Sequence, residues 1–215
     1  MRLTEEDMKK RRETIIHTAF QLFCDHGIES VPISEIAKQA RVSENTICRS
    51  FGNEEKLVLD AFVMLWDTIM HNVEQIVQGV PNYAAMTGYG QIRVWIEGFR
   101  QLYQTDKAFV LFSYEAKLYL MRHNIRLNRF QQDTLMQSFR GPCLAALDKG
   151  KGDGSIPVSE SSEDLFYAIW GCIRGYIVKI VIYANLYGED SPWESRYPVL
   201  ERGILSALSA GWNPP

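Results

Sequence analysis

Apolar residues recur every three or four positions along most of the chain, and this spacing is typical of amphipathic α-helices. Ile15, Ile16, Ala19 and Phe23 form the first such stripe, which ends at Gly27. The same period continues beyond residue 54, with breaks at glycine, proline and asparagine. The later helices are predicted over 54–78, 83–104 (starting near Gly90), 105–124, 126–148, 162–187 and 192–210, with a flexible turn over 150–155. We therefore expect an all-α protein.

Residues 33–51 predict two short helices joined by a tight turn. Ser43 stands where an N-cap belongs, because its hydroxyl can accept a hydrogen bond from a free N–H of the first turn. Ile47 and Phe51, four residues apart, form the buried stripe of the second helix. The opposite face is small and polar: Glu44, Asn45, Thr46, Cys48, Arg49 and Ser50. Such a helix fits the major groove of DNA, which is about 12 Å wide, so the pattern predicts a helix-turn-helix.

The residues in and around this pattern resemble the tetracycline-repressor (TetR) family. The matching elements are Ile15-Ile16-x-x-Ala19-x-x-Leu22-Phe23, Gly27, Glu35-Ile36-Ala37, Val42-Ser43-x-x-Thr46-Ile47 and Phe51-x-Asn53-x-Glu55-x-Leu57. The resemblance implies a homodimer with a three-helix DNA-binding domain over residues 1–53. It also implies a helical domain over residues 54–215 that binds a small effector and dimerises. In such proteins effector binding usually releases DNA.

The chain departs from the family pattern at several positions. Arg41 stands where the turn usually has glycine, so it either adopts a positive φ or reshapes the turn. Cys48 and Ser50 occupy positions usually held by tyrosine and by histidine or tyrosine, and Glu54 replaces a common lysine. Those usual residues commonly contact phosphates. The departures therefore leave an alternative function open, that of a protein–protein adaptor that no longer binds DNA.

Charge gives no strong footprint of a DNA-binding protein. Residues 1–57 hold nine basic and ten acidic residues, so phosphate affinity must come from local clustering. The run 9–12 is Lys-Lys-Arg-Arg, from which we select Lys10 and Arg12; its alternative interpretation is a solvated helix start. Ser34, near the N-terminus of a predicted helix, is a weaker candidate. The candidate DNA-binding residues are Lys10, Arg12, Ser34, Ser43, Glu44, Asn45, Thr46, Cys48, Arg49 and Ser50.

The last two predicted helices carry apolar stripes. In the first, the stripe is Ile169, Ile173, Tyr176, Ile177, Ile180 and Val181, and in the second it is Tyr197, Leu200, Ile204, Leu205 and Leu208. Gly171 and Gly175 lie four apart, and small residues at that spacing allow close approach of another helix. We expect the homodimer to form through these two helices. The alternative is that both stripes face the core of their own protomer.

Aromatic side chains are frequent in the C-terminal part of the chain. The candidate effector-binding residues are Trp95, Phe99, Tyr103, Phe112, Tyr119 and Trp170. They favour an apolar or aromatic effector in an enclosed cavity of roughly 300–1,000 Å³. The alternative is plain core packing.

Composition fits a soluble cytoplasmic protein: of 215 residues, 46% are hydrophobic, and no signal peptide is visible. The most apolar run, residues 176–186, is shorter than the ~20 residues that span a bilayer, so we expect no membrane association. The four cysteines are scattered, which favours free thiols and predicts no metal site. No cofactor-binding or catalytic motif is present, so we expect neither a cofactor nor an enzyme. The leading hypothesis is a ligand-responsive transcriptional repressor.

Overall fold

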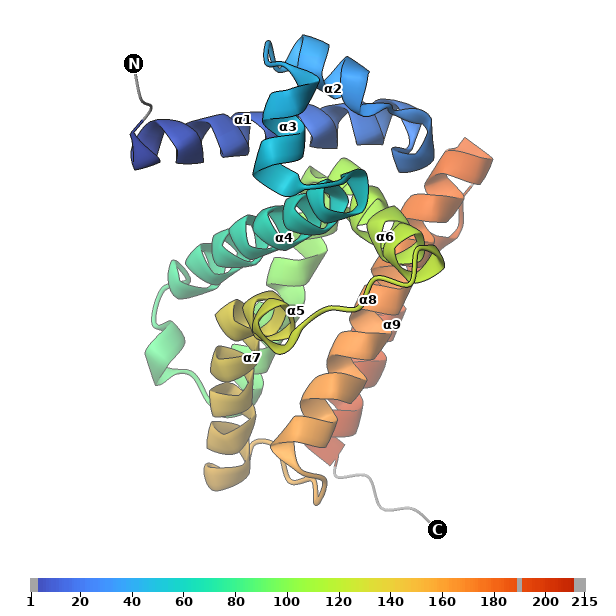
Figure 1. Ribbon diagram of the computed structural model, residues 1–215. Coiled ribbons are helices and arrows are strands. Elements are labelled where there is room, and N and C mark those ends of the chain that lie inside the picture. Colours follow the sequence, from blue (N-terminus) through green and yellow to red (C-terminus); the bar gives the residue numbers. More distant parts are fainter. Residues whose placement is uncertain (1–3, 189–190, 211–215) are drawn as a thin grey trace. The chain divides into compact units, whose positions relative to one another are not determined.

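The computed structural model describes residues 4–188 and 191–210, apart from the side chains of residues 129–130 and 132–138. Within these residues the chain is helical and contains no strand, so the all-α prediction is confirmed (Figure 1). The α-helices are α1 (Glu5–His26), α2 (Ile33–Gln39), α3 (Glu44–Phe51), α4 (Glu54–Gln78), α5 (Gly88–Thr105), α6 (Lys107–Arg122), α7 (Arg129–Gly152), α8 (Ser162–Tyr187) and α9 (Trp193–Ala210). Two 3₁₀ turns are η1 (Ile28–Ser30) and η2 (Tyr83–Ala85).

The segment 150–155 differs from its prediction as a flexible turn. Helix α7 continues to Gly152, and a Cβ atom added to Gly88 of α5 would lie 2.0 Å from the backbone nitrogen of Gly150. The two helices therefore cross at glycines, where any side chain would clash. The Asp153 carboxylate accepts the Gly88 N–H at 2.9 Å, and the Ser155 hydroxyl accepts the N–H of Tyr89 at 3.1 Å. Gly88 and Gly150 thus serve a close helix crossing, and the turn is confined to the residues that follow Gly152.

Packing divides the chain into two compact units. The first, called here unit 1, contains residues 4–66 and 111–132 of the described chain, and unit 2 contains residues 67–110 and 133–210. Unit 1 thus joins α1–α3 with the beginning of α4 and most of α6. The predicted functional boundary after residue 53 does not coincide with this division, because α4 runs unbroken from residue 54 past residue 66.

The core of unit 1 is built by the predicted stripe of α1. Ile15 and Ile16 are fully buried, as are Ile47 and Phe51 of α3. α2 packs on both α1 and α3, as Figure 1 shows. From α6, Phe112 packs edge-on against Phe20 at 5.1 Å between ring centroids. Burial of these side chains favours the fold by roughly 1.5–3 kcal/mol each.

Unit 2 is built around α5. Both α8 and α9 pack on α5, and they also pack on each other along their lengths (Figure 1). The stripe predicted for α8 is largely buried here: Ile173, Ile177, Ile180 and Val181 are at most 6% exposed. From α9, Tyr197, Leu205 and Leu208 are also buried. These stripes therefore pack within their own protomer, which corresponds to the alternative given above for them.

Candidate DNA-binding surface and ligand chamber

Helix α3 has the two faces that its sequence predicts. Ile47 and Phe51 are 1% exposed, and they fix the helix to the core of unit 1. The opposite side carries Ser43, Glu44, Asn45, Cys48 and Arg49, all exposed, with Thr46 and Ser50 half-buried. The predicted polar surface of α3 is therefore accessible.

Both ends of α3 are fixed by hydrogen bonds. The Ser43 hydroxyl accepts the N–H of Thr46 at 3.2 Å, as an N-cap does, and its oxygen lies 2.9 Å from the Thr46 hydroxyl. At the other end Gly52 has a φ of 88° and donates its N–H to the Cys48 carbonyl at 2.8 Å. The helix is eight residues long and is thus closed at each end.

The turn before α3 contains the departure at Arg41. Arg41 has a φ of 55°, so of the two alternatives given for this position the structure has the positive φ. Its N–H donates to the carbonyl of Lys38, and the next N–H, of Val42, donates to that of Ala37. This pair of bonds is the Schellman arrangement that ends many helices, with arginine at the position that glycine favours.

A basic cleft lies between α1 and α3. Its volume is about 480 Å³, and its lining consists of Met8, Lys9, Arg11, Arg12, Thr46, Arg49 and Ser50. Four of these side chains are basic, so the fold concentrates positive charge beside the polar face of α3. Lys9 and Arg11 belong to the basic run but were not among the selected candidates; the run itself was the sequence feature that indicated them.

Lys10 and Ser34 lie outside this cleft. The Lys10 ammonium forms an exposed ion pair with Glu6, one turn earlier, at 2.8 Å. Ser34 is exposed at the second position of α2, near the free N–H groups of that helix. Both remain predicted DNA contacts at the surface of unit 1.

Arg12 has intramolecular partners. Its guanidinium donates to the Ser50 carbonyl at 2.5 Å and forms an ion pair with Asp60 of α4. The same group lies 4.2 Å from the centroid of the Phe51 ring, where a cation is attracted to the aromatic face. A phosphate contact would compete with these three interactions.

Two predicted effector residues belong to unit 1. Phe112 packs between Phe20 and Phe23, with stacked rings 6.1 Å apart in the second pair. The Tyr119 hydroxyl donates to Glu54 at 3.1 Å, and burial together with this carboxylate raises the pKa of Tyr119. Glu54, the departure from a common lysine, therefore serves an internal contact. Phe112 and Tyr119 are thus core residues of unit 1, and the other four candidates belong to unit 2.

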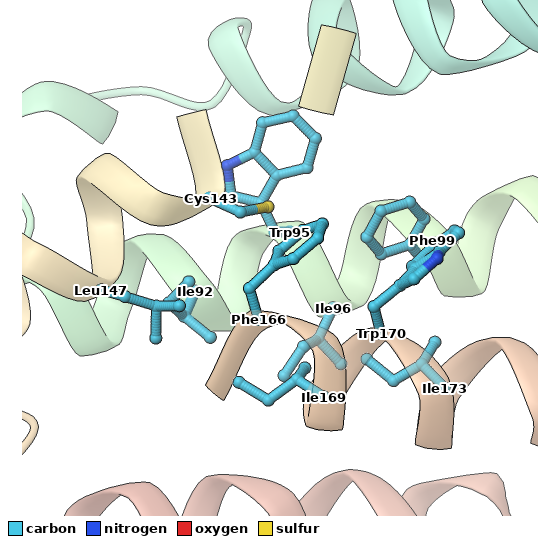
Figure 2. Close-up of a pocket in the computed structure, with 10 residues that line it drawn as sticks. All are labelled: Ile92, Trp95, Ile96, Phe99, Cys143, Leu147, Phe166, Ile169, Trp170 and Ile173. Atoms are coloured by element: carbon cyan, nitrogen blue, oxygen red, sulfur yellow. The ribbon is translucent and has the colours of Figure 1, made fainter. Parts of the chain in front are cut away.

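The other part of the aromatic set meets in unit 2. Trp95 and Phe99 of α5 face Phe166 and Trp170 of α8, as Figure 2 shows, and the Phe99 and Trp170 rings are 4.6 Å apart. They surround a small chamber whose lining is entirely apolar. The lining consists of Ile92, Trp95, Ile96, Phe99, Cys143, Leu147, Phe166, Ile169, Trp170 and Ile173. The aliphatic members and the α7 contribution were missed, although Ile92, Trp95, Ile96 and Phe99 share one helical face.

The chamber has a volume of about 20 Å³, room for roughly one water molecule. The aromatic residues that meet here therefore do not enclose the cavity of several hundred cubic ångströms that the sequence predicted. The reason is that aromatic rings fill the space, since Phe139 also contacts both Phe99 and Trp170. Arg140 of α7 and Glu163 of α8 form an ion pair at 2.5 Å, which holds together two of the helices that line the chamber.

Polar groups near the chamber are few. Burial raises the pKa of the Cys143 thiol, which stays protonated at neutral pH. Trp95 donates its indole N–H to the hydroxyl of Tyr83 at 2.9 Å, and burial raises the pKa of that tyrosine. Tyr103, another predicted effector residue, packs against Tyr197 and is not part of the lining.

One side of α8 remains uncovered within unit 2. Tyr167, Gly171, Cys172 and Gly175 are exposed, and so is Leu186 near the C-terminal end. A Cβ atom added at either glycine would meet no other atom within 4 Å. Among the described residues, α8 is the helix that is long and apolar enough to cross a membrane, on length and composition alone. The same apolar surface is suited to another helix.

The described residues hold no group of three or more histidine, cysteine, aspartate or glutamate side chains placed to bind a metal ion. The site residues singled out above thus form a polar, exposed helix next to a basic cleft in unit 1 and a small apolar chamber in unit 2. The first of these has the layout of a helix-turn-helix DNA-binding protein, in which the second helix of the motif enters the major groove.

The comparisons with known proteins agree with a helix-turn-helix in the N-terminal part of the chain. Residues 15–61 match the family model of the bacterial regulatory proteins of the tetR family. This segment of the chain therefore belongs to the TetR family of transcriptional regulators, as the resemblance at α1–α4 indicated.

Similar proteins extend this comparison. The uncharacterized HTH-type transcriptional regulator YerO of Bacillus subtilis (strain 168) is 24% identical over 144 residues, which are 61% of this chain and 48% of YerO. The match thus spans about half the length of that relative. The fatty acid degradation regulator FadR from Bacillus halodurans has a TM-score of 0.68 at 14% identity, covering 95% of this chain and 97% of FadR. FadR from Bacillus subtilis in complex with stearoyl-CoA has a TM-score of 0.61 at 17% identity, covering 94% and 99%.

Proposed function

We propose that this protein is a ligand-responsive transcriptional regulator that represses by binding operator DNA and leaves the DNA when a small effector binds. The observation that carries the proposal is the exposed face of α3 beside the basic cleft. Asn45 and Arg49 on that face can pair bidentately with adenine and guanine, and the methyl group of Thr46 suits a thymine methyl. The basic cleft supplies the nearby positive charge that phosphates require.

The test is a mobility-shift assay with DNA that flanks the protein's own gene, followed by selection from a random duplex library at low salt. We expect a selected palindrome with half-sites about one helical turn, ~34–36 Å, apart. If the folded protein selects no sequence, with or without candidate ligands, the adaptor function replaces this one. Reversion of Ser50 to histidine and Glu54 to lysine then asks whether binding returns.

The adaptor alternative has less support than the sequence alone suggested. The Glu54 carboxylate accepts the Tyr119 hydroxyl, and the carbonyl of Ser50 accepts the Arg12 guanidinium. The departure at Glu54 thus makes a side-chain contact inside unit 1, whereas the contact at position 50 is made by the backbone and does not depend on the side chain. Neither departure requires that DNA binding has been lost.

We further propose the chamber of unit 2 as the effector site. Its residues from the predicted set are Trp95, Phe99 and Trp170. A charged group placed there would be buried without a partner, which costs several kcal/mol, so the buried part of the effector is neutral and apolar or aromatic. The acyl chain of stearoyl-CoA, bound by FadR of Bacillus subtilis, has this character. Entry requires that the side chains around the chamber move, because its present volume is small.

This part of the proposal is tested with matched ligands, naphthalene and 2-naphthoate. Naphthalene should change the fluorescence of wild-type protein and release the selected DNA, whereas the anion should do neither at equal concentration. Trp170→Phe should reduce the fluorescence response, leaving the part that comes from Trp95, and Trp193→Phe, altered outside the chamber in the same unit, should keep the full response. An equal response to both ligands would exclude an apolar chamber as the site.

The same proposal includes a homodimer through α8 and α9 in the cytoplasm, where the chromosome lies, without a membrane, a cofactor or an enzymatic activity. The uncovered side of α8, with Gly171 and Gly175, supports this assembly. Pairing of α8 with its symmetry mate would cover the apolar surface that otherwise resembles a membrane span.

A further inference from the structure

We infer that Arg12 is a positioning residue for the recognition helix α3 and does not itself bind phosphate. The inference rests on the proposed DNA-binding function and assigns to Arg12 and Asp60 a role that the basic run alone would not suggest. Its basis is one group of contacts within unit 1, contributed by α1, α3 and α4.

The guanidinium of Arg12 has three partners in different directions. One terminal nitrogen donates to the backbone carbonyl of Ser50, the other donates to the carboxylate of Asp60, and the carbon between them lies over the Phe51 ring. A planar group with donors in a fixed fork can satisfy all three, whereas a lysine ammonium cannot. The side chains of Arg12 and Asp60 are 37% and 20% exposed, so the ion pair is partly shielded from solvent.

Helix α3 depends on such contacts because it is short. An isolated helix of eight residues is unstable in water, so contacts with the rest of the unit must hold it. The last four carbonyls of a helix have no partner inside it, and that of Ser50 is among them. Arg12 supplies this partner, and it also covers the ring of Phe51, the residue that anchors the end of α3 in the core.

The consequence for DNA concerns Arg49. This residue directly precedes Ser50 and is exposed on the face that we expect to read bases. A small rotation at the C-terminal end of α3 would displace its guanidinium from a base edge, and bidentate pairing tolerates little displacement. Asp60 acts in the same way through Arg12, although its own charge repels DNA.

The test asks whether Asp60→Asn weakens or strengthens DNA binding. The probes are the duplex selected by the wild-type protein and an unrelated duplex of equal length. The positioning role predicts that Asp60→Asn weakens binding to the selected duplex by roughly tenfold, the equivalent of one charge-assisted hydrogen bond. Binding to the unrelated duplex and the salt dependence should stay near their wild-type values.

A phosphate contact predicts the opposite. Removal of the carboxylate would free Arg12 and delete a negative charge, so both duplexes would bind more tightly and the salt slope would steepen by about one unit. That result would overturn the inference. Arg12→Lys also distinguishes the positioning role from a phosphate contact, because lysine keeps the positive charge but lacks the paired donors of the guanidinium group. The positioning role predicts that Arg12→Lys resembles Asp60→Asn, and wild-type behaviour of Arg12→Lys would contradict it.

Asp25→Asn is the matched control, since it removes an exposed carboxylate at the other end of α1. It should not weaken binding to the selected duplex. Hydrogen exchange of the α3 amides gives a readout that needs no DNA: exchange should accelerate in Asp60→Asn and Arg12→Lys but not in Asp25→Asn. Unchanged exchange in both test variants would overturn the inference. If the wild-type protein selects no duplex, the proposed function fails, while the exchange measurement still decides the role of Arg12 in α3.

Discussion

The backbone N–H of Val42 donates to the carbonyl oxygen of Ala37 at 2.9 Å. This bond reverses the chain between α2 and α3, and it is possible only because Arg41, between the two residues, has a φ of 55°. The helix-turn-helix therefore contains a backbone conformation that costs a side chain roughly 1–2 kcal/mol.

Arg41→Gly should stabilise the protein. Glycine adopts a positive φ without steric cost, and after its larger entropy loss the expected gain is about 0.5–1 kcal/mol in the free energy of unfolding. Urea denaturation measures it. The control is Lys38→Gly in α2, whose ordinary helical backbone gains nothing, so that variant should lose about 1 kcal/mol. A loss in both variants would mean that Arg41 makes a contribution that offsets its φ.

Arg49→Ala and Lys10→Ala should affect DNA binding differently. Loss of Arg49 should remove about 1–3 kcal/mol of discrimination at one base position of the selected duplex. Loss of Lys10 should weaken all duplexes about equally and flatten the salt slope by about one unit. Titrations at several salt concentrations measure both effects. Arg202→Ala, altered at an exposed position of α9, should change neither. A sequence-dependent effect of Lys10→Ala would contradict the assignment.

Alkaline pH should destabilise the protein through Cys143. Burial raises the pKa of this thiol in the folded state, while the unfolded chain releases the proton above about pH 8.5. Unfolding therefore releases a proton at high pH, so the stability from the neutral thiol is present below that pH and is lost as the pH rises. The loss should approach 1.4 kcal/mol per pH unit above about pH 9.

The measurement compares urea denaturation of wild type and Cys143→Ala between pH 7 and 10. The variant should start less stable and show the shallower decline, because tyrosine contributions are common to both proteins. Cys172→Ala, at an exposed position of α8, should retain the wild-type slope. Equal slopes in wild type and Cys143→Ala would show that the thiol titrates as freely as in the unfolded chain.

Gly175→Asp should shift the proposed dimer toward a monomer of 24.7 kDa. The glycine lies on the uncovered side of α8, where a carboxylate would be buried against the same group of a second copy. Light scattering at micromolar concentration measures the mass. Gly141→Asp is the matched control, the same substitution in open space on α7. A dimer that survives Gly175→Asp would place the interface elsewhere. Leu205 is unsuitable for this test, because it is buried in its own protomer.

Local patterns predicted most of the fold. The apolar period gave α4, α8 and α9 nearly to the residue, because their ends carry caps and breaking residues that act over a few positions. The end of α7 could not be found in this way. Gly150 suits a turn as well as a close crossing, and only the contact with Gly88, far away in sequence, decides between them.

The candidate site was also predictable only where local sequence patterns determine it. The exposed face of α3 follows from its own periodicity. The partner of Arg12 is Asp60, 48 residues away, and no local pattern contains that distance. Tyr103 and Tyr119 were predicted to bind the effector but do not line the chamber. The spacing of residues shows which face of a helix is buried, but not which other helix packs against that face. The size of the chamber depends on how Phe99, Phe139 and Trp170 fill it, which the sequence does not reveal.

The carboxylate of Glu115 accepts the N–H of Ile28, directly after α1, at 2.7 Å. Together with Phe112 against Phe20, this contact means that α1–α3, which end by residue 53, take part of their core from residues of unit 1 that follow them by more than fifty positions. A chimaera that transplants only residues 1–53 onto another sensor would leave a backbone donor and an aromatic surface without their partners. A graft that keeps the DNA-binding helices folded must carry residues 111–132 as well. For protein engineering, this domain therefore consists of two segments that are separate in the sequence.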